Sequence, residues 1–247
     1  MSQGQAGQQG TKGGRPDTDA PLDAIWSPSP NQSARRDGLR PSMVVLHYTA
    51  MQGAEAALAR LCDPAAEVSA HYLIGRDGRL WQMVPESQRA WHAGAGEWRG
   101  QGDINSRSIG IELDNTGGHP FSEPQMAVLD VLLAQILRRW SILPEAVIGH
   151  SDMAPGRKCD PGPRFDWARL AGLGLARAVP AVSGSSLQEP DAELEDLFCR
   201  YARDLGYTAP VDMATLLAVL RLRYRPWAAG PLVAEDLIPL AQSDLWL

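Results

Sequence analysis

A stiff loop that joins a histidine to an aspartate is the feature that most restricts how this chain can fold. The short apolar run at residues 146–148 predicts a strand, and His150 follows at its end. Between positions 155 and 163, three prolines and two glycines set an irregular backbone path and exclude a helix. Such a rigid loop can hold Asp160 against His150. Two ligand-type side chains in this arrangement indicate a zinc site, although a catalytic zinc needs three protein ligands.

The third ligand candidate closes another apolar run. Residues 43–48 read Met-Val-Val-Leu-His-Tyr, with apolar side chains on both alternating faces, which is typical of a strand covered on both sides in an α/β sheet. Such sheets bind ligands at strand ends, so His47, His150 and Asp160 would form a His₂Asp site with a fourth position open for water. A histidine is more often a hydrogen-bonded core residue than a ligand, and we assign His71 to the core. The residues alone leave that interpretation open for the trio as well.

The remaining periodicity predicts an α/β fold with a central mixed β-sheet flanked by helices. Strand patterns cover residues 70–74 and 79–84, as a hairpin, and residues 108–113, whereas helical patterns cover residues 54–61, 122–140 and 166 to about 179. The longest of these helices begins at Ser122 with the spacing of a capping box, and it carries an apolar stripe on one face.

Changes in composition divide the chain into four predicted parts. These are a disordered polar tail at residues 1–22, the α/β domain at 23–180, a Ser/Gly/Pro linker at 181–190 and a small three-helix domain at 191–247. In the last part, helical spacing runs from Leu194 to Leu205, stops at Gly206, and resumes from Met213 to the residue before Pro226. Apolar residues at 237–241 predict a short third helix.

The charge and the termini limit the classes of partner and compartment. The formal net charge of −6 argues against nucleic acid, because no surplus of basic residues is present to neutralise phosphates. No apolar run approaches the roughly 20 residues of a membrane span. The first 20 residues lack the apolar core of a signal peptide and a lipid-attachment cysteine. We therefore expect a cytoplasmic protein, or a periplasmic one if the N-terminus of an exported precursor is missing.

One predicted strand carries a carboxylate inside the sheet. In residues 108–113, the side chains of Ile109, Ile111 and Leu113 alternate toward a core, and Glu112 lies on the opposite face. An unpaired charge in that position is unfavourable, so Glu112 needs a structural ion pair or a catalytic task.

Six segments together resemble the zinc-dependent N-acetylmuramoyl-L-alanine amidases of the type 2 family, relatives of the peptidoglycan recognition proteins. They spread over roughly residues 23–170 in the order found in that family. The segments are VVLHYT at 44–49, SAHYLI with RDG at 69–78, AWHAG at 90–94, SIGIEL at 108–113, GHSD at 149–152 and PGRKCDPGP at 155–163. A single one of these motifs is weak evidence, whereas six in register are specific.

The resemblance implies a role for each matching residue. His47, His150 and Asp160 would hold one Zn²⁺, Glu112 would be the general base, and Lys158 would stabilise developing negative charge. These roles suit amide hydrolysis, because zinc polarises the carbonyl and a carboxylate can move a proton from water to the leaving amine. The alternatives are a structural ion pair for Glu112 and a solvated loop charge for Lys158.

Substrate contacts are predicted for four further residues. The peptide stem of peptidoglycan carries carboxylates, which the guanidinium of Arg107 can bind bidentately while Asn105 adds a hydrogen bond. Trp91 and His92 are expected to line the cleft. Arg107 is equally well interpreted as a surface charge, and Trp91 as a packing residue. Cys159, beside Asp160, is interpreted as a bystander.

The predicted activity is hydrolysis of the amide between the lactyl group of N-acetylmuramic acid and L-alanine, in anhydro-muropeptides or in peptidoglycan. The C-terminal part resembles, more faintly, small peptidoglycan-binding modules found beside such amidases. One alternative is a non-catalytic peptidoglycan-recognition protein, and another is a zinc amidase that acts on a different acyl–amino acid bond. The ligands set the chemistry while loops set the substrate, so the sequence leaves the second alternative open.

Overall fold

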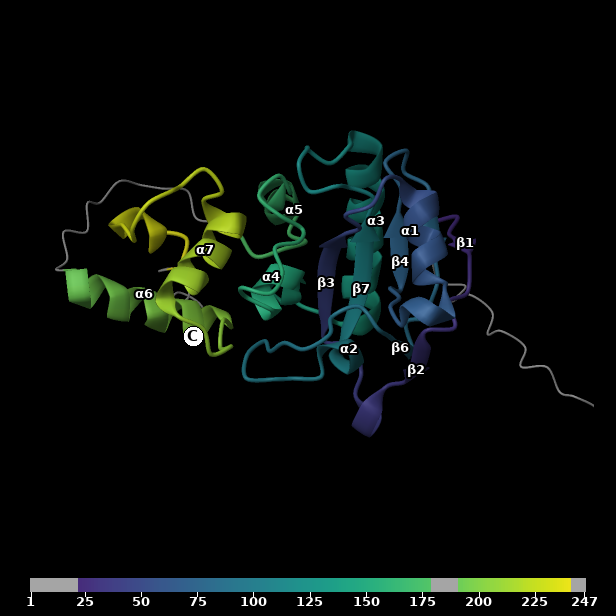
Figure 1. Cartoon of the computed structure of the whole chain (residues 1–247), viewed down its shortest axis with the longest axis horizontal. Helices are drawn as coiled ribbons and strands as arrows, with labels where there is room; N and C mark the ends of the chain where they lie inside the picture. The colour runs from purple at the N-terminus through teal and green to yellow at the C-terminus, as the bar shows by residue number, and fades with distance from the viewer. Residues whose placement is uncertain (1–21, 179–190, 241–247) are drawn as a thin grey trace, which may run out of the picture.

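The computed structural model of the chain describes residues 22–178 and 191–240, and within them six strands form a mixed sheet (Figure 1). Their order is β1 (Ile25–Trp26), β5 (Leu80–Gln82), β4 (Tyr72–Ile74), β7 (Ser108–Leu113), β3 (Met43–Tyr48) and β8 (Val147–Gly149). The β4–β5 pair is the predicted antiparallel hairpin, whereas β3, β4, β7 and β8 run parallel. The predicted mixed sheet is confirmed.

Shorter elements connect these strands. A separate antiparallel pair joins β2 (Gln32–Ala34) to β6 (Gln88–Ala90), the short helices are α2 (Ile104–Arg107) and α4 (His150–Met153), and 3₁₀ turns lie at Arg36–Gly38, Pro64–Ala66 and Pro144–Ala146.

Strand β3 lies inside the sheet, between β7 and β8, and both of its faces are covered. Val44 and Leu46 pack in a cluster with helix α3 (Glu123–Trp140) and helix α5 (Trp167–Gly172). Met43 and Val45 face the other way and pack in a second cluster with the C-terminal helices. A strand with two buried faces must be apolar on both, which is why the sequence pattern was continuous rather than alternating.

The predicted helix boundaries hold with two corrections. Helix α1 (Ala54–Leu61) agrees with the prediction and covers the sheet near β4 and β5. The capping box predicted for α3 is wrong, because Ser122 Oγ donates to Arg76 O, and the Gln125 amide donates to Ile74 O. Both side chains therefore bind backbone carbonyl oxygens at or just after the end of β4 instead of capping the helix. Helix α5 ends at Gly172, well before 179, and Gly174 follows in a left-handed conformation with φ 68°.

The C-terminal region packs against the sheet instead of standing apart from it. Helices α6 (Asp191–Leu205) and α7 (Met213–Tyr224) lie on the β3 side of the molecule, and α1 lies on the β4 side (Figure 1). Buried residues of both helices, including Phe198 and Leu220, share one apolar cluster with Ile148 and Met153. The short helix predicted at residues 237–241 is wrong for its described part, because residues 237–240 form turns that follow a 3₁₀ turn at Ala234–Asp236; residues 241–247 lie outside the described range.

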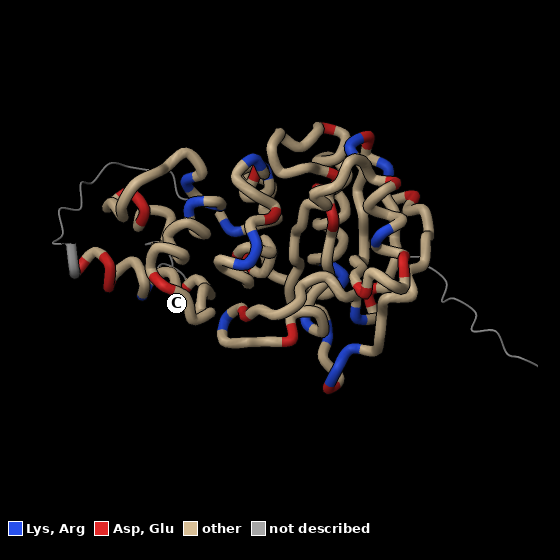
Figure 2. Tube along the Cα trace, in the orientation of Figure 1, with Lys and Arg blue, Asp and Glu red and all other residues tan. Residues whose placement is uncertain are grey.

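Residues 1–21 and 179–190 are likewise outside the described range, so the predicted tail and linker stay predictions. No helix among the described residues is both long and apolar enough to cross a membrane. Basic and acidic residues are interspersed over the sheet region and the C-terminal helices (Figure 2).

Candidate metal centre

Three side chains from distant parts of the sequence meet at the carboxyl ends of parallel strands. His47 lies near the end of β3, and His150 begins α4 directly after β8, whose residue Gly149 is the register partner of Leu46. The loop that follows returns as the sequence predicts, with Ser151 N donating to Asp160 O at 2.9 Å. The return is so close that a Cβ atom on Gly149 would lie 2.7 Å from Pro161 Cδ. A glycine is therefore needed at that strand end.

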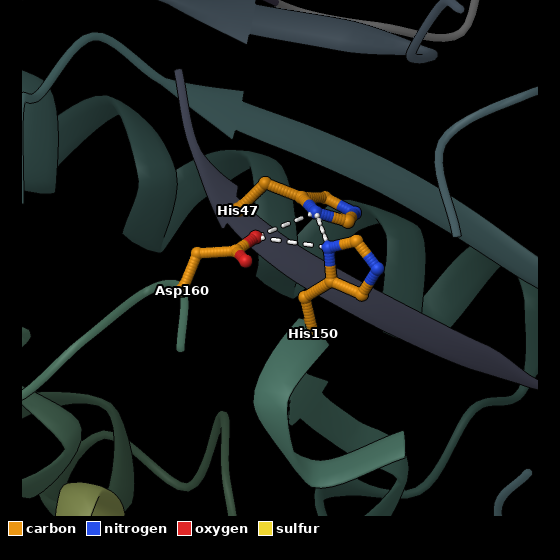
Figure 3. Close-up of side chains that lie close together, drawn as sticks. All are labelled: His47, His150 and Asp160. Carbon is orange, nitrogen blue, oxygen red and sulfur yellow. Dashed lines mark hydrogen bonds and ion pairs between the residues drawn. The ribbon is translucent and has the colours of Figure 1, made fainter. Parts of the chain in front are cut away.

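The three potential ligand atoms form a nearly equilateral triangle (Figure 3). His47 Nδ1 lies 3.0 Å from His150 Nδ1 and 2.9 Å from Asp160 Oδ2, and the third edge, from His150 Nδ1 to Asp160 Oδ2, is 3.1 Å. Two ligands on a tetrahedral zinc with bonds of about 2.0–2.1 Å stand roughly 3.3 Å apart. All three residues are buried, with exposed fractions of 2%, 3% and 7%.

The chemistry of these atoms fits a cation. His150 Nε2 lies 2.9 Å from Ala93 O, a carbonyl that can only accept, so this nitrogen carries a proton. Nδ1 is therefore the nitrogen of His150 that is left to bind a cation, and it faces the carboxylate oxygen of Asp160 and Nδ1 of His47. Burial and the proximity of His150 lower the pKa of His47 to about 4, so its imidazole is neutral at pH 7, the form that binds metals. Buried lone pairs this close together repel one another unless a positive ion lies between them.

Glu112 stands beside this triangle on the neighbouring strand. In the parallel register of β3 and β7, Glu112 is the partner of His47, so both side chains leave the same face of the sheet. Its Oε2 atom is buried and has no hydrogen-bond partner among the described residues. Burial and the charge of Asp160, opposed by Lys158, raise the pKa of Glu112 to about 8. An unpaired carboxyl with a pKa near neutrality suits proton transfer better than a structural ion pair.

A cleft opens over the site. A cavity of about 410 Å³ is lined by the three metal-ligand candidates, by Glu112 and Lys158, and by Arg60 and Leu61 of α1. A neighbouring cavity of about 470 Å³ includes Arg157 and Lys158. Lys158 is an exposed residue of the metal-ligand loop, and its backbone N–H donates to Ala154 O at 3.0 Å.

The four predicted substrate-binding residues have different positions. Trp91 and His92 line both cavities. Asn105 borders the second, but it is 7% exposed and its Oδ1 accepts hydrogen bonds from the backbone N–H groups of His92 and Ala93. Arg107 precedes β7, at the opposite end of that strand from Glu112, and its Nε donates to Gly102 O. Arg107 is not among the described residues that line either cavity.

Two arginines at the cleft were missed by the sequence reasoning. Arg60 carries no local signal, because its position over the site depends on how α1 packs on the sheet. Arg157 did carry a signal, since it lies directly before Lys158 in the loop. Its guanidinium donates to Ala93 O at 2.9 Å and also to Ala95 O.

Comparison with known proteins is consistent with this geometry. The family model described as N-acetylmuramoyl-L-alanine amidase matches residues 37–163, which contain all three ligand candidates. The N-acetylmuramoyl-L-alanine amidase AmiD of Escherichia coli (strain K12) is 36% identical over 212 residues, covering 76% of this chain and 76% of AmiD. The 1,6-anhydro-N-acetylmuramyl-L-alanine amidase AmpD of Enterobacter cloacae is 36% identical over 166 residues, which are 60% of this chain and 89% of AmpD.

Solved structures extend the similarity beyond the sheet region. The structure of E. coli AmiD with the substrate anhydro-N-acetylmuramic acid-L-Ala-D-γ-Glu-L-Lys superposes with a TM-score of 0.72 at 32% identity, covering 83% of this chain and 90% of that one. AmpDh3 of Pseudomonas aeruginosa gives 0.71 at 30% identity, with coverages of 85% and 93%. Coverage this high includes part of the C-terminal helices as well as the α/β domain. The chain belongs to the N-acetylmuramoyl-L-alanine amidase family.

Proposed function

We propose that this chain hydrolyses the amide bond between the lactyl group of N-acetylmuramic acid and L-alanine, with anhydro-muropeptides as its substrate class. The observation that carries the proposal is the convergence of His47, His150 and Asp160 on one point beside Glu112. The solved complexes of AmiD and AmpDh3, which contain anhydromuramyl peptides, support this substrate class.

His47, His150 and Asp160 would hold the metal through Nδ1, Nδ1 and Oδ2, and the set of two imidazoles and a carboxylate suits zinc. A bound zinc would supply Lewis acidity at this point, which makes an amide carbonyl more electrophilic and water a better nucleophile near neutral pH. Glu112 accepts the proton of the attacking water and returns it to the leaving amine of L-alanine. Lys158 brings an ammonium group to the cavity wall, where it stabilises the negative charge that develops on the carbonyl oxygen.

The walls of the cleft provide the substrate contacts in this proposal. Trp91 offers an aromatic surface on which a sugar ring can pack. Arg60 and Arg157 are the guanidinium groups at the cavities, and they replace Arg107 as candidates for binding a stem-peptide carboxylate. Cytoplasmic action stays a prediction, which cell fractionation tests directly.

The experiment is mass spectrometry of a purified anhydro-muropeptide after incubation with the protein, before chelation, after chelation and after zinc is restored. We expect free stem peptide and free anhydro sugar, lost with the chelator and regained with zinc. The variant Glu112→Gln, which keeps the size of the side chain, is the matched control and should release both products about 10²–10⁴-fold more slowly. Binding of the muropeptide by the zinc-loaded protein without cleavage would favour the recognition-protein alternative instead.

A parallel assay with polymeric peptidoglycan as the substrate tests whether the enzyme cleaves the polymer as well as the small muropeptide. A panel of other N-acyl amino acids tests the alternative that the enzyme acts on a different acyl–amino acid bond. Cleavage of such a compound with no cleavage of the muropeptide would contradict the proposed substrate class.

A further inference from the structure

The second imidazole nitrogen of the metal-ligand candidate His47 contacts another histidine rather than solvent. His47 Nε2 lies 3.0 Å from His92 Nδ1, and the two rings meet edge to face with centroids 5.1 Å apart. His92 continues to Ser108, with Nε2 and Oγ 3.1 Å apart, and Ser108 Oγ lies 2.6 Å from Ile104 O. These groups form a single hydrogen-bonded chain that ends at a backbone carbonyl.

We propose that His92 is a positioning residue, which holds His47 in the tautomer that presents Nδ1 to the metal. This inference rests on the metal site of the proposed function. It gives His92 a role through another side chain, distinct from the substrate contact that the sequence suggested.

The direction of each hydrogen bond follows from counting protons along the chain. The carbonyl of Ile104 can only accept, so the hydroxyl proton of Ser108 is used there. Ser108 Oγ then has only lone pairs for His92, and His92 Nε2 must be the donor. A neutral imidazole carries one proton, which leaves a lone pair on His92 Nδ1. His47 Nε2 must therefore donate to it, and the lone pair of His47 lies on Nδ1, facing His150 and Asp160.

Two contacts hold the ring of His92 in place. The ring lies directly against Gly110 of β7, where an added Cβ atom would lie 2.4 Å from His92 Cγ. The backbone on either side is held by Asn105, whose Oδ1 accepts from His92 N at 3.0 Å and from Ala93 N at 2.8 Å. Gly110 thus restricts the ring of His92, and Asn105 fixes the backbone that carries it.

The next residue along performs the equivalent task for the second histidine ligand. Ala93 O accepts the Nε2 proton of His150 at 2.9 Å, which leaves the lone pair of that ring on Nδ1. The dipeptide His92–Ala93 therefore orients both imidazoles, one through a side chain and one through a carbonyl. Hydrogen bonds of this kind outside the ligand shell fix ligand tautomers, and their loss typically weakens metal affinity about 10–100-fold.

Two measurements test the proposal, and the first requires no variant. Nitrogen-15 NMR of the histidine rings in the wild-type protein, zinc-loaded and metal-free, reports which nitrogen of each ring is protonated. We expect protonation at Nε2 for both His47 and His92. A proton on His92 Nδ1 would reverse the chain and overturn the proposal.

The second measurement is the zinc dissociation constant from competition with a chelator. His92→Phe keeps an aromatic ring but cannot accept a hydrogen bond from His47, and we expect zinc affinity to fall about 10–100-fold. Trp91→Phe is the matched control on the same segment, outside the hydrogen-bonded chain, and should keep wild-type affinity. Unchanged affinity in a folded His92→Phe protein would overturn the proposal. A wild-type protein that fails to bind zinc would refute the proposed metal function itself, so the two failures are distinguishable.

Discussion

Arg223 of helix α7 connects the C-terminal region to helix α4, which begins at the metal-ligand candidate His150. Its Nη1 lies 2.8 Å from Asp152 Oδ2, and its guanidinium stacks 3.9 Å from the centre of the Trp167 ring. Asp152 also accepts from the hydroxyl of Tyr207 at 2.7 Å, and it belongs to α4, the helix that begins at His150. Arg223 and Asp152 are only 7% and 1% exposed. This buried ion pair therefore links the C-terminal region to the α/β domain.

Replacing Arg223 with methionine should destabilise the whole protein. The variant keeps most of the apolar stem but leaves the carboxylate of Asp152 buried without its cationic partner, and breaking a buried pair in this way costs about 3–5 kcal/mol. For a chain of this size, 1 kcal/mol lowers the melting temperature by about 2–4 °C, so we expect Tm to fall by ~6–20 °C. Thermal unfolding of the zinc-loaded protein, followed by circular dichroism, measures the change.

Two further variants make the test specific. In Asp152→Asn combined with Arg223→Met, no charge is left buried, so part of the lost stability should return. Arg225→Met is the control near the end of the same helix: Arg225 pairs with Asp236, which keeps its second partner Arg221, so we expect a loss of about 1 kcal/mol or less. A Tm for Arg223→Met within about 3 °C of wild type would refute this reasoning.

Three other predictions concern the site and its neighbours. Glu112→Gln should lower kcat about 10²–10⁴-fold, because the general base is lost, while zinc content measured by mass spectrometry stays at one ion per chain; loss of zinc would contradict the role. Lys158→Met should lower kcat about 10²–10³-fold with zinc affinity retained, and full activity would leave Lys158 as a solvated charge. Burial, then the charge of Arg35, lowers the pKa of His71 to about 3. An unperturbed histidine has a pKa of about 6.5, so between that pH and the lower pKa of His71 the unfolded chain binds one proton more than the folded protein at this residue. The free energy of unfolding therefore falls by about 1.4 kcal/mol per pH unit as the pH drops below ~6.5. Urea unfolding at pH 6.5 and 5.0 measures how steeply stability depends on pH. His71→Gln should reduce this dependence by the contribution of about one proton, and an unchanged dependence would show that His71 does not cause it.

The local chemistry of the sequence determined most of the elements around the site. Residues 43–48 were predicted with the correct bounds, because a strand covered on both faces must be apolar on both. The return of Asp160 to His150 was predictable because prolines and glycines restrict the loop directly. The position of Glu112 on β7 was predictable from alternation, which places its side chain on the face opposite the Ile109 cluster.

The hydrogen-bond partners of individual side chains depend on the folded structure and were not predictable from local sequence. Ser122 and Gln125 have the spacing of a capping box, yet carbonyls about 50 residues away bind both of them. Asn105 was predicted to bind substrate, but its amide oxygen holds the backbone of His92 and Ala93.

Local sequence patterns predicted the candidate ligands, the strands that carry them and the family resemblance, because periodicity and turn chemistry act over a few neighbouring residues. The contact between Arg223 and Asp152 joins positions 71 residues apart, and the contact between the His47 and His92 rings joins positions 45 apart. Neither has a local signature, since arginine and histidine occur as readily in exposed positions. Their roles follow only from the folded chain, where burial removes water as a competing partner and leaves each polar group to be satisfied by the protein.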